Sequence, residues 1–596
     1  MRLRHRWLAC AVGVGLSLCL CTACIKRSTP TPMLAATPTP VLPSSFTPTP
    51  TAGVAQPSPT PSEAAPVSTD TPKAPASPTP APGVTVTAPA LSATLRVGWL
   101  GVPQSLTPDP AGPSAADAFL ACIYDTFIYH SLNNTFAPAV AKSWSSPDGG
   151  KTWWFDLQPN LKTQAGQPFT SADVAAALQA FQTDAGLRYY GGYSLTVQSV
   201  EASAPNSLTV TLTQPVGNVE AVLHWMPLVP KSVVDSGAFA QGQHVGTGPF
   251  ALQGFEPGQR ITLTANPAYW MGSPRIGSVV VQNYADADQL AQALLDGSVD
   301  VVAQAPPRLI AMLKADARVQ VLSGPQPRVS SLLLNVSTKP QSTGHPALRN
   351  RQVRLAIAHC IDRQQLIDLA LLGRGIPGTS IIPPTLGKWF SPGLQDVPFD
   401  LDKAQQLLEG AGYKDSNGDG VRESPGGAKP LQVRLFALAN AAVASQTASI
   451  ISNWLSQAGI GVTIQTLTPA ALDSVAALNY DLLLADLDSG PDPGYLLSTL
   501  TSAEIETGLN RSGYSNPAYD SLWQQQATTV DQEQRRALVW QLQQIALDDR
   551  PCIALYYELA VQAFRKDRFR NWLFVPNGAL SLLDVRSLLQ VEPIPQ

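Results

Sequence analysis

Residues 431–467 read LQVRLFALANAAVASQTASIISNWLSQAGIGVTIQTL and have the pattern of a strand, a helix and a second strand. The first strand is predicted at 433–436. The apolar side chains that then recur at helical spacing are Ile450, Ile451, Trp454 and Leu455. Gly459 is typical of the end of a helix, and Val462 and Ile464 follow on the second strand. Strands joined through a helix pair in parallel with a right-handed crossover, so this stretch predicts an α/β fold.

Much of the remaining sequence alternates strands and helices in the same way. Residues 94–100 (TLRVGWL) and 151–157 (KTWWFDL) are predicted strands. Helices are predicted after Thr170 and within 286–302 (DADQLAQALLDGSVDVV), and another begins at the N-cap residue Asp531. The apolar stripe of that last helix consists of Leu538, Leu542 and Ile545. No internal repeat is found, so we expect an α/β protein with mixed sheets.

The first 23 residues have the composition of an export signal. A basic patch precedes a nearly unbroken apolar run from 7 to 23, which is at the short end for a membrane span of roughly 20 residues. Cys21 and Cys24 have the C-x-x-C spacing of a redox pair or half a zinc site, but that chemistry needs a folded domain. The run ends in a stretch that resembles a bacterial lipobox, with Cys21 where the pattern prefers Leu. The resemblance implies that residues 1–23 are a lipoprotein signal peptide and that Cys24 carries a lipid.

Residues 24–92 are expected to hold the lipidated cysteine and a disordered linker. From Ser28 to about Ser92 the chain is mostly Pro, Thr, Ser and Ala. This composition buries too little apolar surface to offset the entropy of ordering, and its prolines favour an extended polyproline II spacer. A spacer of this kind lets a folded body stand clear of the membrane.

The body from Ala93 onward has about 500 residues, enough for two to four domain-sized units. The chain has 44% hydrophobic and 14% charged residues and a formal net charge of −4. These values are typical of a globular body and offer no basic field for nucleic acid. The cysteines of the body are Cys122, Cys360 and Cys552. Their odd number and wide spacing leave two alternatives, one bridge with a free thiol or three buried thiols.

No motif for catalysis is present in the sequence. The histidines of the body are His130, His224, His244, His345 and His359. No two are spaced i, i+4, and the sequence has no H-E-x-x-H, G-x-S-x-G, Walker or G-x-G-x-x-G motif. We expect each histidine to be an ordinary core or surface residue. The sequence therefore predicts a protein that is not an enzyme and that needs no cofactor or resident metal.

One segment, 415–423 (DSNGDGVRE), matches the start of a calcium-binding loop. The residues at loop positions 1, 3, 5 and 6 are Asp415, Asn417, Asp419 and Gly420. An EF-hand then needs a bidentate Glu at position 12, where this chain has Gly426, although Glu423 stands at position 9. The alternative is a tight Asn-Gly/Asp-Gly turn, which needs only residues that tolerate positive φ. The sequence favours the turn and leaves calcium binding open.

Five segments of the body resemble, in order, the sequence signatures of solute-binding protein family 5, the extracytoplasmic receptors of dipeptide, oligopeptide and nickel ABC importers. The second of them reads GTGPFALQGFEPGQRITLTANPAYWMG. The segments are 140–181, 246–272, 332–367, 399–423 and 514–566. Together they cover the body almost from end to end. Relatives commonly carry an Asp-Gly turn in the fourth segment, which further favours a turn over a calcium loop.

The resemblance implies a periplasmic-binding-protein-like fold of type II, with two lobes joined by a hinge and an extra subdomain on the first lobe. Lobe I is expected to gather residues 93–128, 240–325 and 550–590. The extra subdomain is expected at 129–239 and lobe II at 326–549. A protein of this kind binds its solute by closing the lobes, which needs a cleft with converging polar groups and no catalyst.

The resemblance also points to ligand-binding residues. Peptide-binding relatives carry Trp-x-x-Asp shortly before Asp-Pro, and that Asp holds the α-amino group of the peptide. The matching stretch at 482–497 (LLLADLDSGPDPGYLL) contains Asp492-Pro493 but lacks the Trp. Asp488 lies one place further from Asp-Pro than the family spacing, and Asp486 lies further still. We expect Asp488 to face the cleft and to be the candidate for an amine, whereas the alternative is a loop whose aspartates only form Asx turns.

Other candidates follow from their positions in the family. Tyr495 and the loop 101–106, with Gln104 and Ser105, are expected near the ligand, as is Trp225 near the lobe junction. Each aromatic residue has the core as its alternative location.

The function implied is an extracytoplasmic receptor, anchored to the membrane by its N-terminal lipid and monomeric. It would deliver a peptide or peptide-like solute to the permease and ATPase of an ABC importer, with no nucleic-acid partner. An oligosaccharide or nickel chelate as ligand, and a signalling receptor without transport, remain open. A secreted hydrolase on the same fold is disfavoured because catalytic motifs are missing from the sequence.

Overall fold

The structure is a computed structural model that describes residues 93–595 with short gaps. The gaps are 108–114, 132–133, 184–196, 240, 428, 439–441, 469–474, 476 and 575–583. The predicted signal peptide, Cys24 and the predicted linker lie outside the described residues. Within the described part of the chain, no helix is long and apolar enough to cross a membrane.

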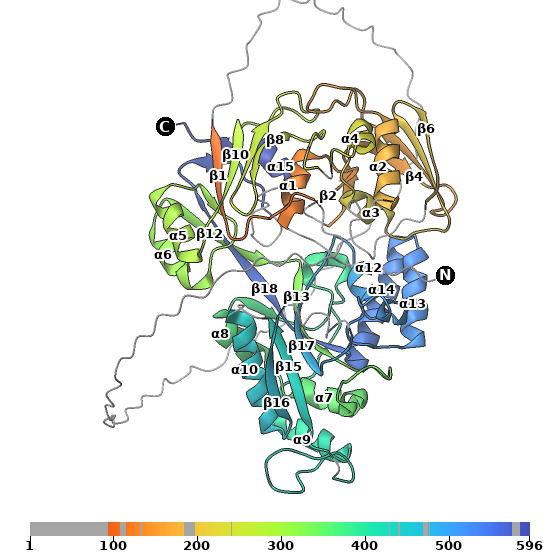
Figure 1. The fold of residues 1–596 in the computed structure, drawn as a ribbon, viewed down its shortest axis with the longest axis vertical. Helices are drawn as coiled ribbons and strands as arrows, with labels where there is room; N and C mark the ends of the chain where they lie inside the picture. The colour runs from red at the N-terminus through yellow and green to blue at the C-terminus, as the bar shows by residue number, and fades with distance from the viewer. Residues whose placement is uncertain are drawn as a thin grey trace, which may run out of the picture. The chain divides into compact units, whose positions relative to one another are not determined.

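One twelve-stranded mixed sheet connects most of the described chain (Figure 1). Its strands follow the order β16-β15-β17-β13-β18-β11-β1-β10-β9-β8, and β12 and β14 also pair with β18 (Cys552–Arg565). On one side of β18 lie β13 (Arg328–Leu334), β14 (Gly375–Pro377), β15 (Gln432–Leu438), β16 (Gly461–Leu467) and β17 (Leu482–Asp488). On the other side lie β1 (Thr94–Trp99), β8 (Phe250–Glu256), β9 (Arg260–Ala265), β10 (Ser278–Asn283), β11 (Val301–Val302) and β12 (Val319–Pro325). The strand β18 thus divides the sheet into the halves of a two-lobe fold.

Two connections pass from one half of the sheet to the other. The start of β18 pairs with β13, where Cys552 lies opposite Leu333, and its end pairs with β12, where Arg565 lies opposite Val319. The second connection is the short link 325–328 between β12 and β13. Both lie where the two halves of the sheet meet, so bending there would change the angle between the halves and leave the pairing within each half intact. They are the candidate hinge.

The predicted strand–helix–strand unit at 431–467 is confirmed. The strands β15 and β16 pair in parallel, and α10 (Ala442–Gln457) connects them. The predicted helix residues that are buried in this core are Ile451, Trp454 and Leu455. The chain turns at Gly459, whose φ of 84° is the left-handed conformation that glycine favours. Ile464 is 44% exposed because β16 is the last strand of the sheet and has a neighbour on one side only.

A separate antiparallel sheet, the small sheet, has the strand order β4-β5-β7-β6. After it, the chain returns to the large sheet at β8. Its strands are β4 (Ala141–Ser145), β5 (Thr152–Leu157), β6 (Val197–Ala204) and β7 (Ser207–Leu212). Alternate residues of β5 are buried, as the sequence predicts, while Trp154 between them is 52% exposed. The helix α2 (Ser171–Thr183) packs on this sheet, and Thr170 donates from its N–H to Asp173 (2.8 Å). The cluster of buried side chains here runs from residue 127 to residue 228.

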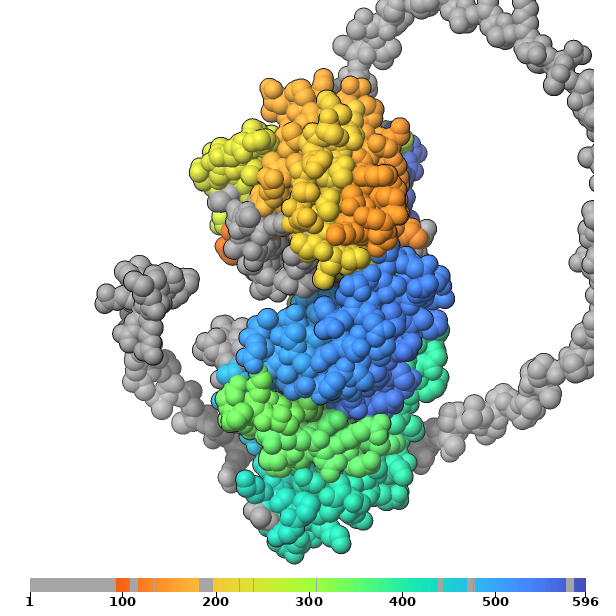
Figure 2. All heavy atoms as spheres, turned by 90° about the vertical axis from the view of Figure 1, so that its right-hand side faces the viewer, coloured from red at the N-terminus to blue at the C-terminus, as the bar shows by residue number. Residues whose placement is uncertain are grey.

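The remaining helices and short strands complete the fold. The other α-helices are α1 (Ala115–Ile123), α3 (Val219–Trp225), α4 (Lys231–Ser236), α5 (Ala287–Asp296), α6 (Ile310–Ala315), α7 (Arg351–His359), α8 (Arg363–Leu371), α9 (Leu401–Gly410), α12 (Gly494–Ser498), α13 (Pro517–Thr528), α14 (Gln532–Asp549) and α15 (Val585–Gln590). The short strand pairs are β2 (Ile128–His130) with β3 (Phe136–Pro138), and β19 (Phe569–Arg570) with β20 (Glu592–Pro593). Figure 2 shows α13 and α14 (blue) against the segment of the small sheet (orange to yellow). Their contact includes the Gly217 N–H, which donates to the Ala527 carbonyl oxygen (2.7 Å).

The buried face of α14 differs from the predicted one. Of the three residues expected there, Leu542 is buried, whereas Leu538 and Ile545 are only partly buried. The buried residues of the helix are Arg535, Val539, Leu542, Gln543 and Ala546. Arg535 is 1% exposed and forms an ion pair with the equally buried Asp492. A charged residue can occupy this buried face because its ion-pair partner, which comes from another segment of the chain, is buried beside it.

The three cysteines of the body are buried and free. Of the two alternatives for Cys122, Cys360 and Cys552, three buried thiols is the correct one. Burial raises the pKa of each thiol to about 12, so all three are protonated at neutral pH.

Candidate functional site

A cavity of about 650 Å³ lies between segments from both halves of the large sheet. Its size falls within the range of roughly 300–1,000 Å³ that is typical of small-molecule sites. The lining residues come from 121–139, His224, 269–271, 325–327, 384–387, 489–491 and 584–586. The link 325–327 belongs to the candidate hinge, so a ligand here would touch both lobes and the connection between them.

Asp125 is a buried carboxyl group in the wall of this cavity. It is 5% exposed, and it accepts hydrogen bonds from the Tyr269 hydroxyl (2.6 Å) and from Nε1 of Trp270 (3.0 Å). Burial raises the pKa of Asp125 to about 6, although these two hydrogen bonds lower it. A carboxylate has about four acceptor positions, so Asp125 can still accept from a ligand.

A second carboxyl group, Asp584, caps the start of α15. Its Oδ1 accepts from the backbone N–H groups of Arg586 (2.9 Å) and Ser587 (3.2 Å), and its Oδ2 accepts from the Tyr129 hydroxyl (2.8 Å). Burial raises the pKa of Asp584. The guanidinium of Arg586 stacks over the Tyr129 ring, 3.7 Å from its centroid. Asp584 therefore fixes the helix that presents a guanidinium to the cavity.

Two histidines meet in the same wall. The rings of His130 and His224 lie 5.5 Å apart, and the backbone N–H of His130 donates to Nδ1 of His224 (3.2 Å). Burial lowers the pKa of His130 to about 4 and that of His224 to about 3, so both rings are neutral at physiological pH. Nε2 of His130 is buried and has no hydrogen-bond partner among the described residues. Their convergence was not expected, because 94 positions separate them.

The rest of the wall is largely apolar and includes a contact between the two halves of the molecule. Trp270, Met271 and the prolines at 325 and 327 supply apolar surface. Nδ2 of Asn134, after β2, donates to the carbonyl oxygen of Thr385 on the other side of the cavity. This hydrogen bond connects the two lobes at one edge of the cavity.

The predicted aspartates at the end of β17 do not line the cavity. Asp488 accepts from Nε (2.6 Å) and Nη2 (3.2 Å) of Arg328 and is 40% exposed. Asp486 accepts from the Ser330 hydroxyl. The three residues after Asp488, at 489–491, do line the cavity. The predicted stretch therefore reaches the site through this turn.

Asp492 and Tyr495 lie just beyond that turn, and neither lines the cavity. Asp492 is 2% exposed and accepts from both terminal nitrogens of Arg535 (2.5 and 2.7 Å) as well as from the Gly494 N–H (2.8 Å). Tyr495 is partly buried and packs between the core of the small sheet and that of α13 and α14. Both residues therefore position the turn 489–491 without lining the cavity themselves.

Of the other predicted residues, Gln104 and Ser105 do not line the cavity. Gln104 and Ser105 are exposed, and the Ser105 hydroxyl lies 2.7 Å from that of Thr107. Trp225 is the last residue of α3, directly after His224, but its side chain lies outside the described part of the chain.

Sequence reasoning missed Asp125, Tyr129, Trp270 and Arg586. Trp270 lies within 246–272, one of the segments that resemble the family, so its aromatic ring could have been singled out there. The other three have no motif around them and come together only in the folded chain. Asp125 and Trp270 are 145 positions apart, and Tyr129 and Asp584 are 455 positions apart.

Comparisons with known proteins agree with this architecture. Residues 135–507 match the family model described as bacterial extracellular solute-binding proteins, family 5 Middle. The glutathione-binding protein GsiB of Salmonella typhi is 24% identical over 519 residues, covering 80% of this chain and 96% of GsiB.

Two solved structures share the fold. The oligopeptide-binding protein AppA from Bacillus subtilis, in complex with a nonapeptide, has a TM-score of 0.70 at 20% identity and covers 85% of this chain and 100% of its own. NikZ from Campylobacter jejuni, in complex with Ni(L-His), has a TM-score of 0.71 at 19% identity with the same coverage. These likenesses confirm the predicted two-lobe fold of type II. The protein belongs to family 5 of the bacterial extracellular solute-binding proteins.

Proposed function

We propose that the protein captures a peptide or peptide-like solute in the cavity between its lobes and delivers it to the permease and ATPase of an ABC importer. Family membership supports the binding role, and relatives named for glutathione and for oligopeptides support the ligand class. A solute that touches both lobes stabilises the closed arrangement through its greater affinity for that state. This function requires no catalytic group.

The observation that carries the proposal is the placement of opposite charges in one apolar cavity. Asp125, ionised above about pH 6, is the partner for a ligand ammonium group. Arg586 has five N–H donors, of which one is directed to the Pro138 carbonyl oxygen (3.2 Å), and is the partner for a carboxylate. Trp270 and Met271 supply apolar surface for a side chain. A short peptide carries these three kinds of group.

Asp488 remains a prediction for the amine-binding residue. Its carboxylate accepts hydrogen bonds from two nitrogens of Arg328, so a ligand ammonium group would compete with Arg328 for the same oxygens. We therefore propose Asp125 as the first partner and Asp488 as the alternative. The two are distinguished by the variants Asp125→Asn and Asp488→Asn.

Thermal unfolding of the purified protein with a ligand panel tests the proposal. The panel contains a dipeptide with free termini, its N-acetylated form, its C-terminal amide, a simple sugar and a nickel–histidine chelate. A ligand at a hundred times its Kd adds about 2.7 kcal/mol of stability, which raises Tm measurably. We expect the free dipeptide to raise Tm and both blocked forms to raise it less.

Variants assign the effect to residues. Asp125→Asn is expected to lose the preference for the free amine, whereas the exposed Asp402→Asn on α9 serves as the control and keeps it. If Tm responds to the sugar or the chelate and to no peptide, the binding role stands and the peptide class is wrong.

A nickel chelate is a second candidate ligand, and the pair of histidines favours it. His130 and His224 lie 5.5 Å apart in the cavity wall, and nitrogen ligands of this kind suit Ni²⁺. Calorimetric titration with the nickel–histidine chelate tests this reading. Binding that disappears in both His130→Ala and His224→Ala and survives in Asp125→Asn would favour the chelate over the peptide.

We also propose that residues 1–23 direct export and that Cys24 carries the lipid anchor. The basic patch, the apolar run and the lipobox-like end support this reading. Fractionation of cells that express the protein tests it. Wild-type protein is expected in the membrane fraction and Cys24→Ala in the soluble fraction, and a variant that stays with the membrane would exclude the anchor.

A further inference from the structure

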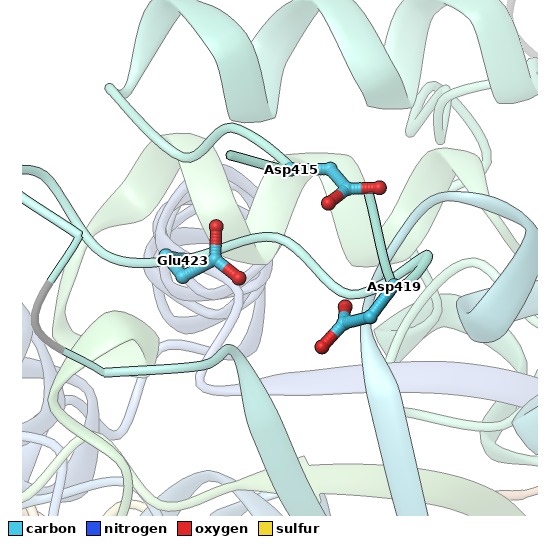
Figure 3. A group of neighbouring side chains, drawn as sticks. All are labelled: Asp415, Asp419 and Glu423. Atoms are coloured by element: carbon cyan, nitrogen blue, oxygen red, sulfur yellow. The ribbon is translucent and has the colours of Figure 1, made fainter. Parts of the chain in front are cut away.

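The loop 415–423, between α9 and β15, brings three acidic side chains close together (Figure 3). Asp415, Asp419 and Glu423 each place a carboxylate oxygen within 4.8 Å of the other two. The loop is outside the cavity wall described above. The sequence of this segment matches the start of a calcium-binding loop, although the sequence alone favours a plain turn.

The carboxyl group of Glu423 is the observation that a plain turn does not explain. Glu423 is 7% exposed, and its Oε2 accepts from the Ser416 N–H (2.7 Å). Its Oε1 is buried and has no hydrogen-bond partner in the described chain. A buried carboxylate oxygen without a donor costs free energy. Figure 3 shows this carboxyl group facing the two aspartates, so a cation placed among the three groups would satisfy it.

The geometry and chemistry of the cluster fit Ca²⁺. Calcium binds oxygen at roughly 2.3–2.6 Å, so two oxygens on one ion lie at most about 5 Å apart, which matches the observed spacing. The ligand atoms are all carboxylate oxygens, without nitrogen or sulfur, and such a set suits hard cations. Two of the three groups are exposed, so water can complete the coordination.

The backbone already holds the aspartates in position. Asp415 accepts from the N–H groups of Gly418 (2.7 Å) and Gly420 (3.0 Å), and Asp419 accepts from that of Val421 (2.8 Å). Glu423 is positioned by a hairpin in which its N–H donates to the Lys414 carbonyl oxygen (2.8 Å). Glu423 at position 9 thus takes the place of the EF-hand glutamate, which is absent at position 12.

We propose that Asp415, Asp419 and Glu423 form a calcium site that stabilises this loop of lobe II. The neighbouring Arg422 donates from Nε to the Ala458 carbonyl oxygen (2.9 Å) and from Nη1 to that of Tyr413 (3.1 Å), at the end of α10 and after α9. Calcium binding would therefore stabilise the strand–helix–strand unit. It would leave the affinity of the solute cavity unchanged.

Calorimetric titration of the EDTA-treated protein with CaCl₂ tests the proposal, together with Tm in EDTA and in calcium. We expect one Ca²⁺ per chain and a rise of a few °C in Tm, with Mg²⁺ at least tenfold weaker because it demands tighter octahedral geometry. Absence of binding up to millimolar calcium, or an equal affinity for Mg²⁺, would overturn the assignment.

Calcium affinities of variants of these carboxylates distinguish a calcium site from a purely structural turn. Glu423→Gln is expected to lose at least tenfold in calcium affinity, yet to melt no lower than wild type in EDTA, because it removes a buried charge of which one oxygen, Oε1, has no hydrogen-bond donor in the described chain. Asp419→Asn is expected to weaken binding similarly, and the control Asp402→Asn is expected to bind calcium as wild type does. Unchanged calcium affinity in Glu423→Gln and Asp419→Asn would overturn the proposal.

Discussion

Asp125 combines burial with a position in the cavity wall, and its ionisation links the site to the stability of the fold. Burial raises its pKa from 3.8 to about 6, so the folded protein holds a proton that the unfolded chain releases above pH 4. The stability gained from this proton is fully present below about pH 4 and is lost as pH rises through about 6. The difference between the two pKa values corresponds to about 3 kcal/mol.

We therefore expect the stability of wild type, relative to Asp125→Asn, to fall between about pH 4 and pH 6 and to level out above pH 7. Urea unfolding of both proteins across this range measures the difference. Only the pH dependence is compared, because the absolute level also reflects the hydrogen bonds from Tyr269 and Trp270. A difference that stays constant with pH would mean that Asp125 titrates normally.

The ion pair of Asp492 with Arg535 makes a second prediction at this scale. Both side chains are almost fully buried, and Arg535 also stacks on the Trp389 ring at 4.8 Å. Asp492→Ala leaves the guanidinium buried without its partner, so we expect a loss of about 3–5 kcal/mol in the free energy of unfolding.

The double variant Asp492→Ala, Arg535→Met is expected to recover part of that loss, because it removes the unpaired charge. Asp235→Ala is the control, since Asp235 forms an exposed pair with Lys231 that should contribute less than about 1 kcal/mol. An equal effect of Asp492→Ala and the control would show that the buried pair does not hold the turn.

Among the helices, α14 shows how a local signal sets an element boundary. Asp531 accepts from the N–H groups of Glu533 (3.1 Å) and Gln534 (2.8 Å) at the start of the helix. We expect Asp531→Ala to cost about 1 kcal/mol in denaturant unfolding, and Asp531→Ser to restore most of it, because Ser also caps helices. A serine variant as unstable as the alanine variant would assign the loss to something other than the cap.

The same helix shows what the sequence could and could not predict. The cap at Asp531 and the unit at 431–467 depend on residues close together in the chain, and both were predictable from periodicity and capping. The buried face of α14 was not, because Arg535 is buried only through Asp492, 43 positions away. The cavity is of this second kind, since Asp125, Trp270 and Arg586 come from three distant segments. The resemblance pointed to the stretch 482–497, which contains the cavity-lining turn 489–491, but it did not point to these side chains.

At the scale of the whole molecule, the proposed capture of a solute requires movement between the lobes. Gly217, between β7 and α3, lies very close to the turn between α13 and α14. A Cβ added to Gly217 would lie 2.3 Å from the Thr529 carbonyl oxygen. Gly217→Ala is therefore expected to push the two apart, favour the open arrangement and weaken solute binding at least fivefold.

Small-angle scattering and binding measurements on Gly217→Ala check this expectation. The control is Gly254→Ala, where the nearest atom to an added Cβ is 4.0 Å away, and it should scatter and bind as wild type does. Unchanged affinity and radius of gyration in Gly217→Ala would mean that this contact does not limit closure.

The proposed peptide site is tested most directly by calorimetric titration of the wild-type protein with a dipeptide and with its N-acetylated form, at about pH 7.5 and about pH 5. We predict one saturable site for the free dipeptide, binding roughly tenfold weaker at about pH 5 because Asp125 is then protonated, and little or no binding of the acetylated form. Equal binding of both forms, or no binding of any peptide, would contradict the proposed peptide site.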